Sequence, residues 1–373
     1  MTRRALLPLG ITLVALVIGC VGRVSYDGGT GGDGGFAATD GGDAGFTVTQ
    51  QLVFMMTGGP PPGPTTSSEL GLVNLDGSGL RQLTNDGKYK FLPHFSPDGT
   101  RIVYTKFETA GYGSPNATAD VAVFNLATQT EKMITQGGAN VQGTWSPDGT
   151  AVAFLSGTAA PGQGISVNKI LIVSADGGSP QEIGAAAGTP SDMFWGDIAW
   201  SSGSGWILFT VAQNPDGGCF NVRTDKILPD GGSRTQVTNG GPNCTPQGWE
   251  QSGDADPGWS SDGLTIYSSR GFPFEPSGAP DGGNPIACRK LYSFPSDAWF
   301  PGKVENDLSL PAVPNCIEGV PKGSPDGTRV LLYRACLDAG TLVAPGTYVT
   351  DAAGSYRTFV IAGFGADWNP VAR

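Results

Sequence analysis

The sequence predicts an all-β protein, a six-bladed β-propeller, on three observations. A motif built on Trp-Ser-Pro-Asp-Gly returns along most of the chain, successive copies stand 45 to 64 residues apart, and apolar residues alternate with polar ones around each copy. A repeat with a period near 50 residues is typical of propellers and other repeat arrays. No stretch of the repeated region has a convincing helical period, so the repeated unit is predicted to consist of strands.

Each copy of the motif is predicted to be a β-hairpin around a tight turn. In Ser-Pro-Asp-Gly the proline presets φ, the aspartate can bond to its own backbone, and the glycine accepts a positive φ. In five copies a β-branched residue follows seven positions after the first residue of the motif, as expected in a second strand. We call that first residue the lead position, and we expect its aromatic side chain to fill the core between neighbouring sheets. The six lead positions are Phe95, Trp145, Trp200, Trp259, Gly323 and Trp368.

The repeat resembles the WSPDG repeat of TolB-like β-propellers, and the resemblance covers about residues 48 to 373. Three copies keep Ser-Pro-Asp-Gly intact, at residues 96–99, 146–149 and 324–327. The copy at Trp200 lacks the proline and the aspartate, and the copy at Gly323 lacks the aromatic residue. The resemblance implies a ring of blades, each with four antiparallel strands.

The two ends of the chain are predicted to share one blade. Residues 51–56 look like the second strand of a blade but have no motif before them, and residues 69–75 and 80–84 look like its third and fourth strands. The missing first strand is predicted at residues 366–369. Five complete hairpin units and this split unit make six blades, and closing the ring with strands from both termini removes free sheet edges.

The connections between strands have unequal lengths. Those between the first and second strands are tight, whereas those between the second and third strands and the crossovers between blades are long. In an up-and-down blade the two long sets emerge on the same face of the ring, and we expect function to concentrate on that face, the long-loop face. The long connections are predicted at residues 57–68, 107–119, 157–168, 271–287 and 336–346, with a crossover at 239–255.

The region before the propeller is predicted to target and anchor the protein. Arg3 and Arg4 precede an apolar run at residues 6–18, which is short for a membrane span. Gly19-Cys20 at its end resembles a bacterial lipobox, which implies cleavage before Cys20 and acylation of that residue; an ordinary secretory signal is the alternative. Residues 1–19 are thus a predicted lipoprotein signal peptide, residues 20–46 a flexible Gly/Asp-rich lipidated tether, and residues 47–373 the propeller.

The tether has one alternative interpretation, a calcium-binding Asp/Gly repeat, but its spacing is irregular. Val21, which follows the lipidated cysteine, is not the aspartate associated with retention at the inner membrane. The sequence therefore predicts a cell-envelope protein, lipid-anchored at the outer membrane.

Five cysteines remain beside Cys20, and an oxidising compartment favours disulfides. Cys219 and Cys244 lie almost symmetrically about a predicted turn and are expected to pair. Cys316 is placed to pair with Cys336, or alternatively with Cys288. No Cys-x-x-Cys occurs and the chain has one histidine, so we expect no metal centre and no cofactor.

Charge excludes one class of partner. The formal net charge is −11, and loss of Arg3 and Arg4 with the signal peptide would make it −13. A strongly acidic chain with no basic run is a poor nucleic-acid binder, so no nucleic-acid partner is expected.

Catalytic motifs are mostly absent from the sequence. The single histidine, His94, is expected to pack near the first motif, and no Gly-x-Ser-x-Gly motif occurs. Asp197, Asp256 and Asp367 are placed at the starts of inner strands, where they would either bind a cation or basic group at the mouth of the channel or simply cap the strands.

The sequence therefore favours a protein–protein binding or scaffold module over an enzyme. The expected partner is an envelope protein or a peptidoglycan-associated protein, docked on the long-loop face. The alternative is a carboxylate-dependent glycan-active lyase or hydrolase with its site in the channel. The docking aromatics are predicted to be Tyr112, Phe194, Trp195, Trp249, Phe272 and Phe274, with Trp299 and Phe300 on the opposite face. The alternative, weighted equally for Phe194, is that such a ring only pins its own long loop to the propeller.

Overall fold

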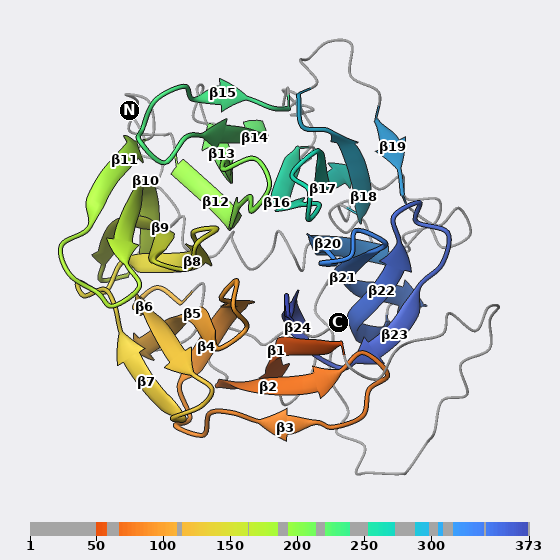
Figure 1. The fold of residues 1–373 in the computed structure, drawn as a ribbon, viewed down its shortest axis with the longest axis horizontal. Coiled ribbons are helices and arrows are strands. Elements are labelled where there is room, and N and C mark those ends of the chain that lie inside the picture. The colour runs from red at the N-terminus through yellow and green to blue at the C-terminus, as the bar shows by residue number, and fades with distance from the viewer. Residues whose placement is uncertain are drawn as a thin grey trace, which may run out of the picture.

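Six blades surround a central channel in the computed structural model (Figure 1). The structure describes residues 50–57, 67–109, 114–162, 164–185, 193–213, 221–238, 253–272, 288–297, 305–308, 316–338 and 341–371. The predicted signal peptide, the predicted tether and Cys20 lie outside these residues. Within the described ranges, no helix is both long and apolar enough to cross a membrane.

Every blade is an antiparallel sheet of four strands, with its first strand nearest the channel and its fourth at the rim (Figure 1). Blades 1 to 3 contain, from the channel outward, β24 (Phe364–Trp368), β1 (Gln51–Thr57), β2 (Ser68–Asn74) and β3 (Arg81–Gln82); β4 (Tyr89–Phe95), β5 (Arg101–Thr109), β6 (Thr118–Asn125) and β7 (Thr130–Met133); and β8 (Asn140–Trp145), β9 (Ala151–Ala160), β10 (Gly164–Ser174) and β11 (Gln181–Ala185).

Blades 4 to 6 continue the ring in the same order. They contain β12 (Met193–Trp200), β13 (Ile207–Gln213), β14 (Asn221–Ile227) and β15 (Thr235–Gln236); β16 (Asp254–Trp259), β17 (Thr265–Phe272), β18 (Cys288–Pro295) and β19 (Asn306–Asp307); and β20 (Cys316–Gly323), β21 (Arg329–Asp338), β22 (Thr341–Asp351) and β23 (Thr358–Ile361). A parallel pairing of Arg289 with Ile317 links β18 to β20, so blades 5 and 6 form one continuous sheet.

The ring closes by pairing the two ends of the chain. β24 and β1 are antiparallel neighbours, with Leu52 opposite Trp368 and Val53 opposite Asp367. The predictions of an all-β fold, six blades and a split blade are therefore confirmed.

The motif turns have the chemistry that the sequence predicts. In the copy at Trp145, the Ser146 hydroxyl donates to Asp148 Oδ1 at 2.6 Å, and the Thr150 amide donates to the same oxygen at 3.0 Å. Gly149 has a φ of 69°, which favours a residue without a side chain. The hydrogen bonds from Ser146 and Thr150 lower the pKa of Asp148 to about 2, so this turn keeps its charge across the physiological range.

Three lead tryptophans join their blade to the one before it. The indole Nε1 atoms of Trp145, Trp259 and Trp368 donate to backbone carbonyls of the preceding blade, at His94 (3.0 Å), Ala199 (3.1 Å) and Lys322 (3.0 Å). All three indoles are buried, which confirms the prediction that lead aromatics fill the core between sheets. Trp200 instead donates to Gly205 in its own hairpin, in the copy that lacks proline and aspartate.

Two predicted long loops are arms of extended hairpins instead. β9 and β10 stay paired out to Ala160 and Gly164, across the region predicted as a loop at residues 157–168. Pro161-Gly162, a turn dipeptide, lies between the two arms, and the flanking residues are small or β-branched, which suits strand pairing. β21 and β22 likewise pair out to Asp338 and Thr341. The long-loop face therefore carries two projecting hairpins.

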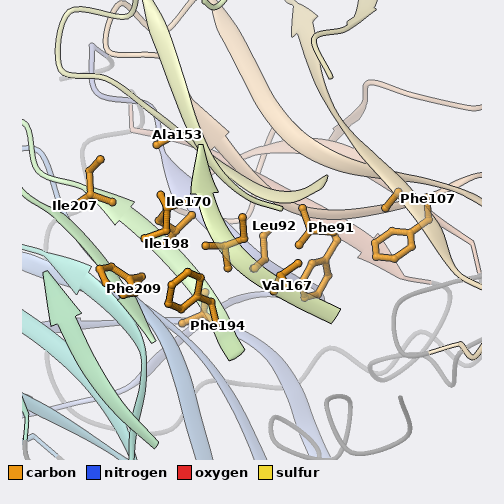
Figure 2. Packing of buried hydrophobic residues seen from close by; sticks show 14 of the residues in the cluster. Phe91, Leu92, Phe107, Ala153, Val167, Ile170, Phe194, Ile198, Ile207 and Phe209 are labelled. Carbon is orange, nitrogen blue, oxygen red and sulfur yellow. The ribbon is translucent and has the colours of Figure 1, made fainter. Parts of the chain in front are cut away.

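A large apolar cluster joins blades 1, 2, 3, 4 and 6 around the channel. Figure 2 shows part of it, with Leu92 and Phe91 of blade 2 facing residues of blades 3 and 4. Phe194 belongs to this cluster and is fully buried, with its ring edge-to-face against Phe209 at 5.1 Å between centroids. Of the two alternatives for Phe194, the structure therefore supports packing over docking, because the ring fills the core of its own blade.

Ring closure should dominate stability. Trp368→Ala should lower the free energy of unfolding by about 3–5 kcal/mol, because a buried indole and its contacts with Leu52 and Phe54 would be lost. Urea unfolding followed by circular dichroism measures this. Val371→Ala, at an exposed site three residues later, is the control and should change stability little. Equal effects from the two variants would contradict the closed ring.

Candidate functional site

Each inner strand contains a bulge at the same place. In all six blades the register between the first and second strands shifts, so that two residues of the inner strand fall between paired positions. The first of the two has a φ between 46° and 61° in every blade. A bulge bends a strand and re-aims its side chains, so it fixes what the blade presents near the channel. These first residues are Leu92, Gln142, Gly196, Asp256, Val320 and Gly365.

In four blades the backbone of the bulge is strained. Leu92, Gln142, Asp256 and Val320 are not glycine, and a β-branched residue such as Val320 is rarely found in the left-handed region. Such strain persists only where the surrounding structure holds it, and it gathers at functional sites. The sequence analysis did not predict these bulges. A weak signal for them exists in three blades, where a proline stands two residues before the lead position, at Pro93, Pro257 and Pro321.

Four charged residues from four blades meet in the channel, and we call them the channel cluster: His94, Asp197, Lys322 and Asp367. Lys322 Nζ forms an ion pair with Asp197 Oδ2. His94 Nε2 lies 3.4 Å from Asp197 Oδ1, a charge contact without hydrogen-bond geometry, and His94 Nδ1 lies 3.8 Å from Asp367 Oδ2. Asp367 Oδ2 also accepts a hydrogen bond from the Phe95 amide at 2.9 Å. The cluster therefore connects blades 1, 2, 4 and 6.

Asp197 is the centre of the cluster and is completely buried. Burial alone would raise its pKa, but the Lys322 ammonium and the His94 imidazole hold the pKa of Asp197 well below its usual range. Its backbone amide contacts Asp256 Oδ1 at 3.3 Å, which brings a fifth blade into the arrangement. Lys322 and His94 therefore favour the ionised form of Asp197 despite its burial.

His94 has the opposite shift. Burial and the nearby Lys322 charge lower its pKa, but the carboxylates of Asp197 and Asp367 outweigh them, so that the pKa of His94 is raised above its ordinary value. His94 is buried directly before the first motif, as expected, but its contacts with two carboxylates were not expected. The sequence placed it next to an aromatic core residue, and only the fold brings carboxylates from other blades beside it.

A cavity of about 380 Å³ lies over the channel cluster. Three cluster members, His94, Lys322 and Asp367, reach it, and the rest of its wall comes from the motif copies, including their prolines and serines. The lead aromatics in the wall are Phe95, Trp145, Trp200, Trp259 and Trp368. Because the motif turns surround it, this cavity belongs to the tight-turn face, opposite the long-loop face. Its size is in the usual range for ligand pockets.

The predicted carboxylates are present in the channel region but not where the sequence put them. Asp197 and Asp367 lie late in β12 and β24, and Asp256 lies in the bulge of β16, whereas all three were expected at strand starts near the long-loop face. Asp367 alone of the three lines the cavity. Lys322 was missed, although alignment of the repeats would have revealed it, since His94, Lys322 and Asp367 all occupy the position directly before a lead residue.

Of the predicted docking aromatics other than Phe194, the structure describes the backbone of two, Trp195 and Phe272. Trp195 lies in β12, with its backbone opposite Thr210, and Phe272 lies in β17, opposite Cys288. The other members of the set lie outside the described residues, as do both residues of the opposite-face pair: Tyr112, Trp249, Phe274, Trp299 and Phe300.

Two cysteines form a disulfide within blade 6. Cys316 and Cys336 are opposite each other on β20 and β21, and their sulfurs are bonded. Cys288 begins β18, and Cys219 and Cys244 lie outside the described residues. Over the described ranges, no group of three or more His, Cys, Asp or Glu side chains is arranged to hold a metal ion.

Comparisons with known proteins place the fold. TolB from Acinetobacter baumannii has a TM-score of 0.57 at 16% identity, over 87% of this chain and 68% of that one. A putative TolB from Agrobacterium tumefaciens has a TM-score of 0.52 at 16% identity, over 85% and 91% of the two chains. The fold is that of a TolB-like six-bladed β-propeller.

The TolB-like fold extends to a further solved structure of different function. Kuenenia stuttgartiensis hydrazine synthase has a TM-score of 0.62 at 14% identity, over 88% of this chain and 48% of that one. No protein-family model matches the sequence, and no curated protein matches it. At identities this low the similarity concerns the fold alone, so the function has to be argued from the site.

Because the chain has a single histidine, the raised pKa of His94 can be tested directly. Between the ordinary pKa of histidine near 6.5 and the higher folded-state pKa, the folded protein binds more protons than the unfolded chain. The free energy of unfolding should therefore fall as pH rises through this window. His94→Gln should remove that slope, as measured by urea unfolding between about pH 6 and pH 8.5.

An NMR titration of the imidazole gives the pKa itself, because no other histidine contributes signals. Asp367→Asn should lower the pKa of His94, since one of its two carboxylate neighbours becomes neutral. An imidazole that titrates at or below about 6.5 in the unmodified protein would contradict the cluster.

Proposed function

We propose that this protein is a cell-envelope lipoprotein whose propeller binds another envelope protein, or a peptidoglycan-associated one, through the cavity on the tight-turn face. The observation that carries the proposal is the 380 Å³ cavity, with aromatic and proline walls and a charged floor of His94, Lys322 and Asp367. Apolar walls with a few convergent polar groups are what binding pockets need for affinity and orientation. The occupant is a side chain or short segment of the partner.

The envelope location rests on two further features. Residues 1–20 resemble a lipoprotein signal ending in Cys20, and the Cys316–Cys336 disulfide suits an oxidising compartment. Acylation at Cys20 would hold the protein at the outer membrane, and the Gly/Asp-rich residues after it would let the propeller reach its partner.

Binding is favoured over catalysis by the state of the carboxylates. A general acid or base works best with a pKa near the working pH. Asp197 is held as an anion far below that range by Lys322 and His94, and Asp367 is engaged by the Phe95 amide. The alternative function, a carboxylate-dependent glycan-active lyase or hydrolase, would have to use His94 with Asp367 as its reacting groups. Loss of turnover of an oligosaccharide substrate in both His94→Gln and Asp367→Asn would favour it.

The binding proposal is tested by filling the cavity. Ser202→Trp places a large ring at the exposed lip of the wall, and capture of the partner from envelope extract should fall at least tenfold. Ala127→Trp adds the same ring at an exposed turn at the rim of blade 2, and should leave capture unchanged. The bait is the propeller with its tether and without lipid.

Trp249→Ala decides between the two faces. Loss of capture in Trp249→Ala with normal capture in Ser202→Trp would place the partner on the long-loop face and contradict the proposal. Melting temperatures of all three variants should match the parent protein, so that a binding loss is not a folding loss.

Lipid anchoring is tested by Cys20→Ala. This variant should stay uncleaved or be released from membranes, because the predicted anchor requires the thiol and the new amino terminus of that residue. Fractionation of cells followed by a high-salt wash measures this. A variant that is processed normally and still resists the wash would show that Cys20 is not the anchor.

A further inference from the structure

Three cysteines are aligned across three neighbouring strands. The strand order at the joint of blades 5 and 6 is β18-β20-β21. Cys316 on β20 lies opposite Cys336 on β21, and on its other side the parallel pairing of Arg289 with Ile317 puts Cys288 in register with Cys316. Cys316 therefore has a cysteine at the neighbouring register position on each side.

The spacing permits a disulfide on either side. Neighbouring strands in a sheet lie about 4.8 Å apart, which is within the range of Cα separations that disulfides span. The structure has the bond between Cys316 and Cys336. Cys219 and Cys244 are expected to pair with each other, which leaves Cys288 as the odd cysteine of the propeller.

A buried guanidinium adjoins the existing disulfide. Arg334 Nε lies 3.3 Å from Cys336 Sγ, and Arg334 Nη2 lies 3.4 Å from Cys316 Sγ. The side chain of Arg334 is 9% exposed, so water screens its charge poorly. A positive charge at this distance stabilises a thiolate, and a disulfide releases a stabilised thiolate more readily.

The nearby carboxylate is shared between two guanidinium groups. Glu318 Oε1 lies 3.7 Å from Arg334 Nε, and the two Glu318 oxygens accept hydrogen bonds from Arg357 at 2.7 and 2.8 Å. One carboxylate thus faces two guanidinium groups, which leaves a net positive charge beside the two sulfurs.

We propose that Cys288, Cys316 and Cys336 form a thiol–disulfide exchange site that moves a covalent link between blades. The Cys288 thiol gives its proton to solvent, and its sulfur attacks the Sγ atom of Cys316. The Cys288–Cys316 bond forms as the Cys316–Cys336 bond breaks, and Cys336 leaves as a thiolate beside Arg334. One disulfide and one thiol are present before and after the step, so no oxidant or reductant is consumed.

The two bonds have different mechanical effects. The Cys316–Cys336 bond lies within blade 6, whereas a Cys288–Cys316 bond ties β18 of blade 5 to β20 of blade 6. Apart from any disulfide, β18 and β20 are joined by the backbone pairing of Arg289 with Ile317. Exchange therefore switches the joint between a form held by backbone pairing and a form held covalently, independently of any partner in the cavity.

Peptide mapping of the folded, oxidised protein tests the proposal. Trypsin separates the three cysteines into peptides 271–289, 304–322 and 335–357. Iodoacetamide at about pH 8, followed by acid quenching and mass spectrometry, should find both the Cys288–Cys316 and the Cys316–Cys336 links, with Cys336 and Cys288 alkylated respectively. Alkylation of Cys288 alone with only the Cys316–Cys336 link, or Cys288 bonded to Cys219 or Cys244, would overturn the proposal.

Two sets of variants complete the test. Cys336→Ser, produced in an oxidising compartment, should contain the Cys288–Cys316 disulfide, and two free thiols in that folded variant would show that the register does not bring them together. Arg334→Gln should slow alkylation of Cys336 about threefold or more, because the leaving thiolate loses its stabilising charge, whereas Arg334→Lys should retain most of the rate. Equal rates in both Arg334 variants and the parent protein would exclude the role of the guanidinium. If Cys336→Ser does not fold, the mapping of the parent protein still decides.

Discussion

The pairing of β24 with β1 is the constraint on which the rest of the structure depends. It removes the two free sheet edges that an open array of blades would expose. It also completes the cavity, because β24 supplies Asp367 to the charged floor and Trp368 to the wall. The indole of Trp368 donates to the Lys322 carbonyl of blade 6, and Asp367 accepts a hydrogen bond from the Phe95 amide of blade 2, so the last strand of the chain contacts both neighbouring blades. Closure of the ring and the candidate cavity therefore both depend on the pairing of the two ends of the chain.

Burying the channel cluster costs free energy of folding. Taking charges out of water carries a desolvation cost that an ion pair only partly offsets, and replacing such a pair by apolar residues is often neutral or stabilising. Here Asp197 is fully buried, and its counter-charges come from blades 2 and 6. The cluster can form only when blades 1, 2, 4 and 6 are correctly placed around the ring. Its position under the cavity gives the protein a polar floor that apolar packing could not provide.

Much of the fold was predictable because its determinants are local. The turn in Trp145-Ser146-Pro147-Asp148-Gly149 is encoded by residues that bond to one another, and the number of such motifs predicted the number of blades. Closure followed from the unmatched strand at each end of the chain. Burial of the lead tryptophans followed from their fixed place beside a turn.

The site was predictable only in part, because its residues meet through long-range geometry. His94 and Lys322 are 228 positions apart in sequence, and neither stands near a recognisable catalytic motif. The bulges in the inner strands leave no strong local pattern, since residues as different as Leu92, Asp256 and Gly365 adopt the same positive φ. Loop lengths misled the prediction of two long loops for a related reason. The residues of β9 and β10 near Pro161-Gly162 continue the ladder, which a count of residues between strand cores could not reveal.

The central claim, that the tight-turn cavity receives a partner protein, is tested most directly by crosslinking in living cells. A photoreactive phenylalanine analogue at position 202, at the lip of the cavity, should give a specific crosslinked product with an envelope or peptidoglycan-associated protein. The same analogue at position 127, at the rim of blade 2, should give none. A crosslink from position 127, or from position 249, which the sequence predicts to lie on the long-loop face, without one from position 202 would contradict the account.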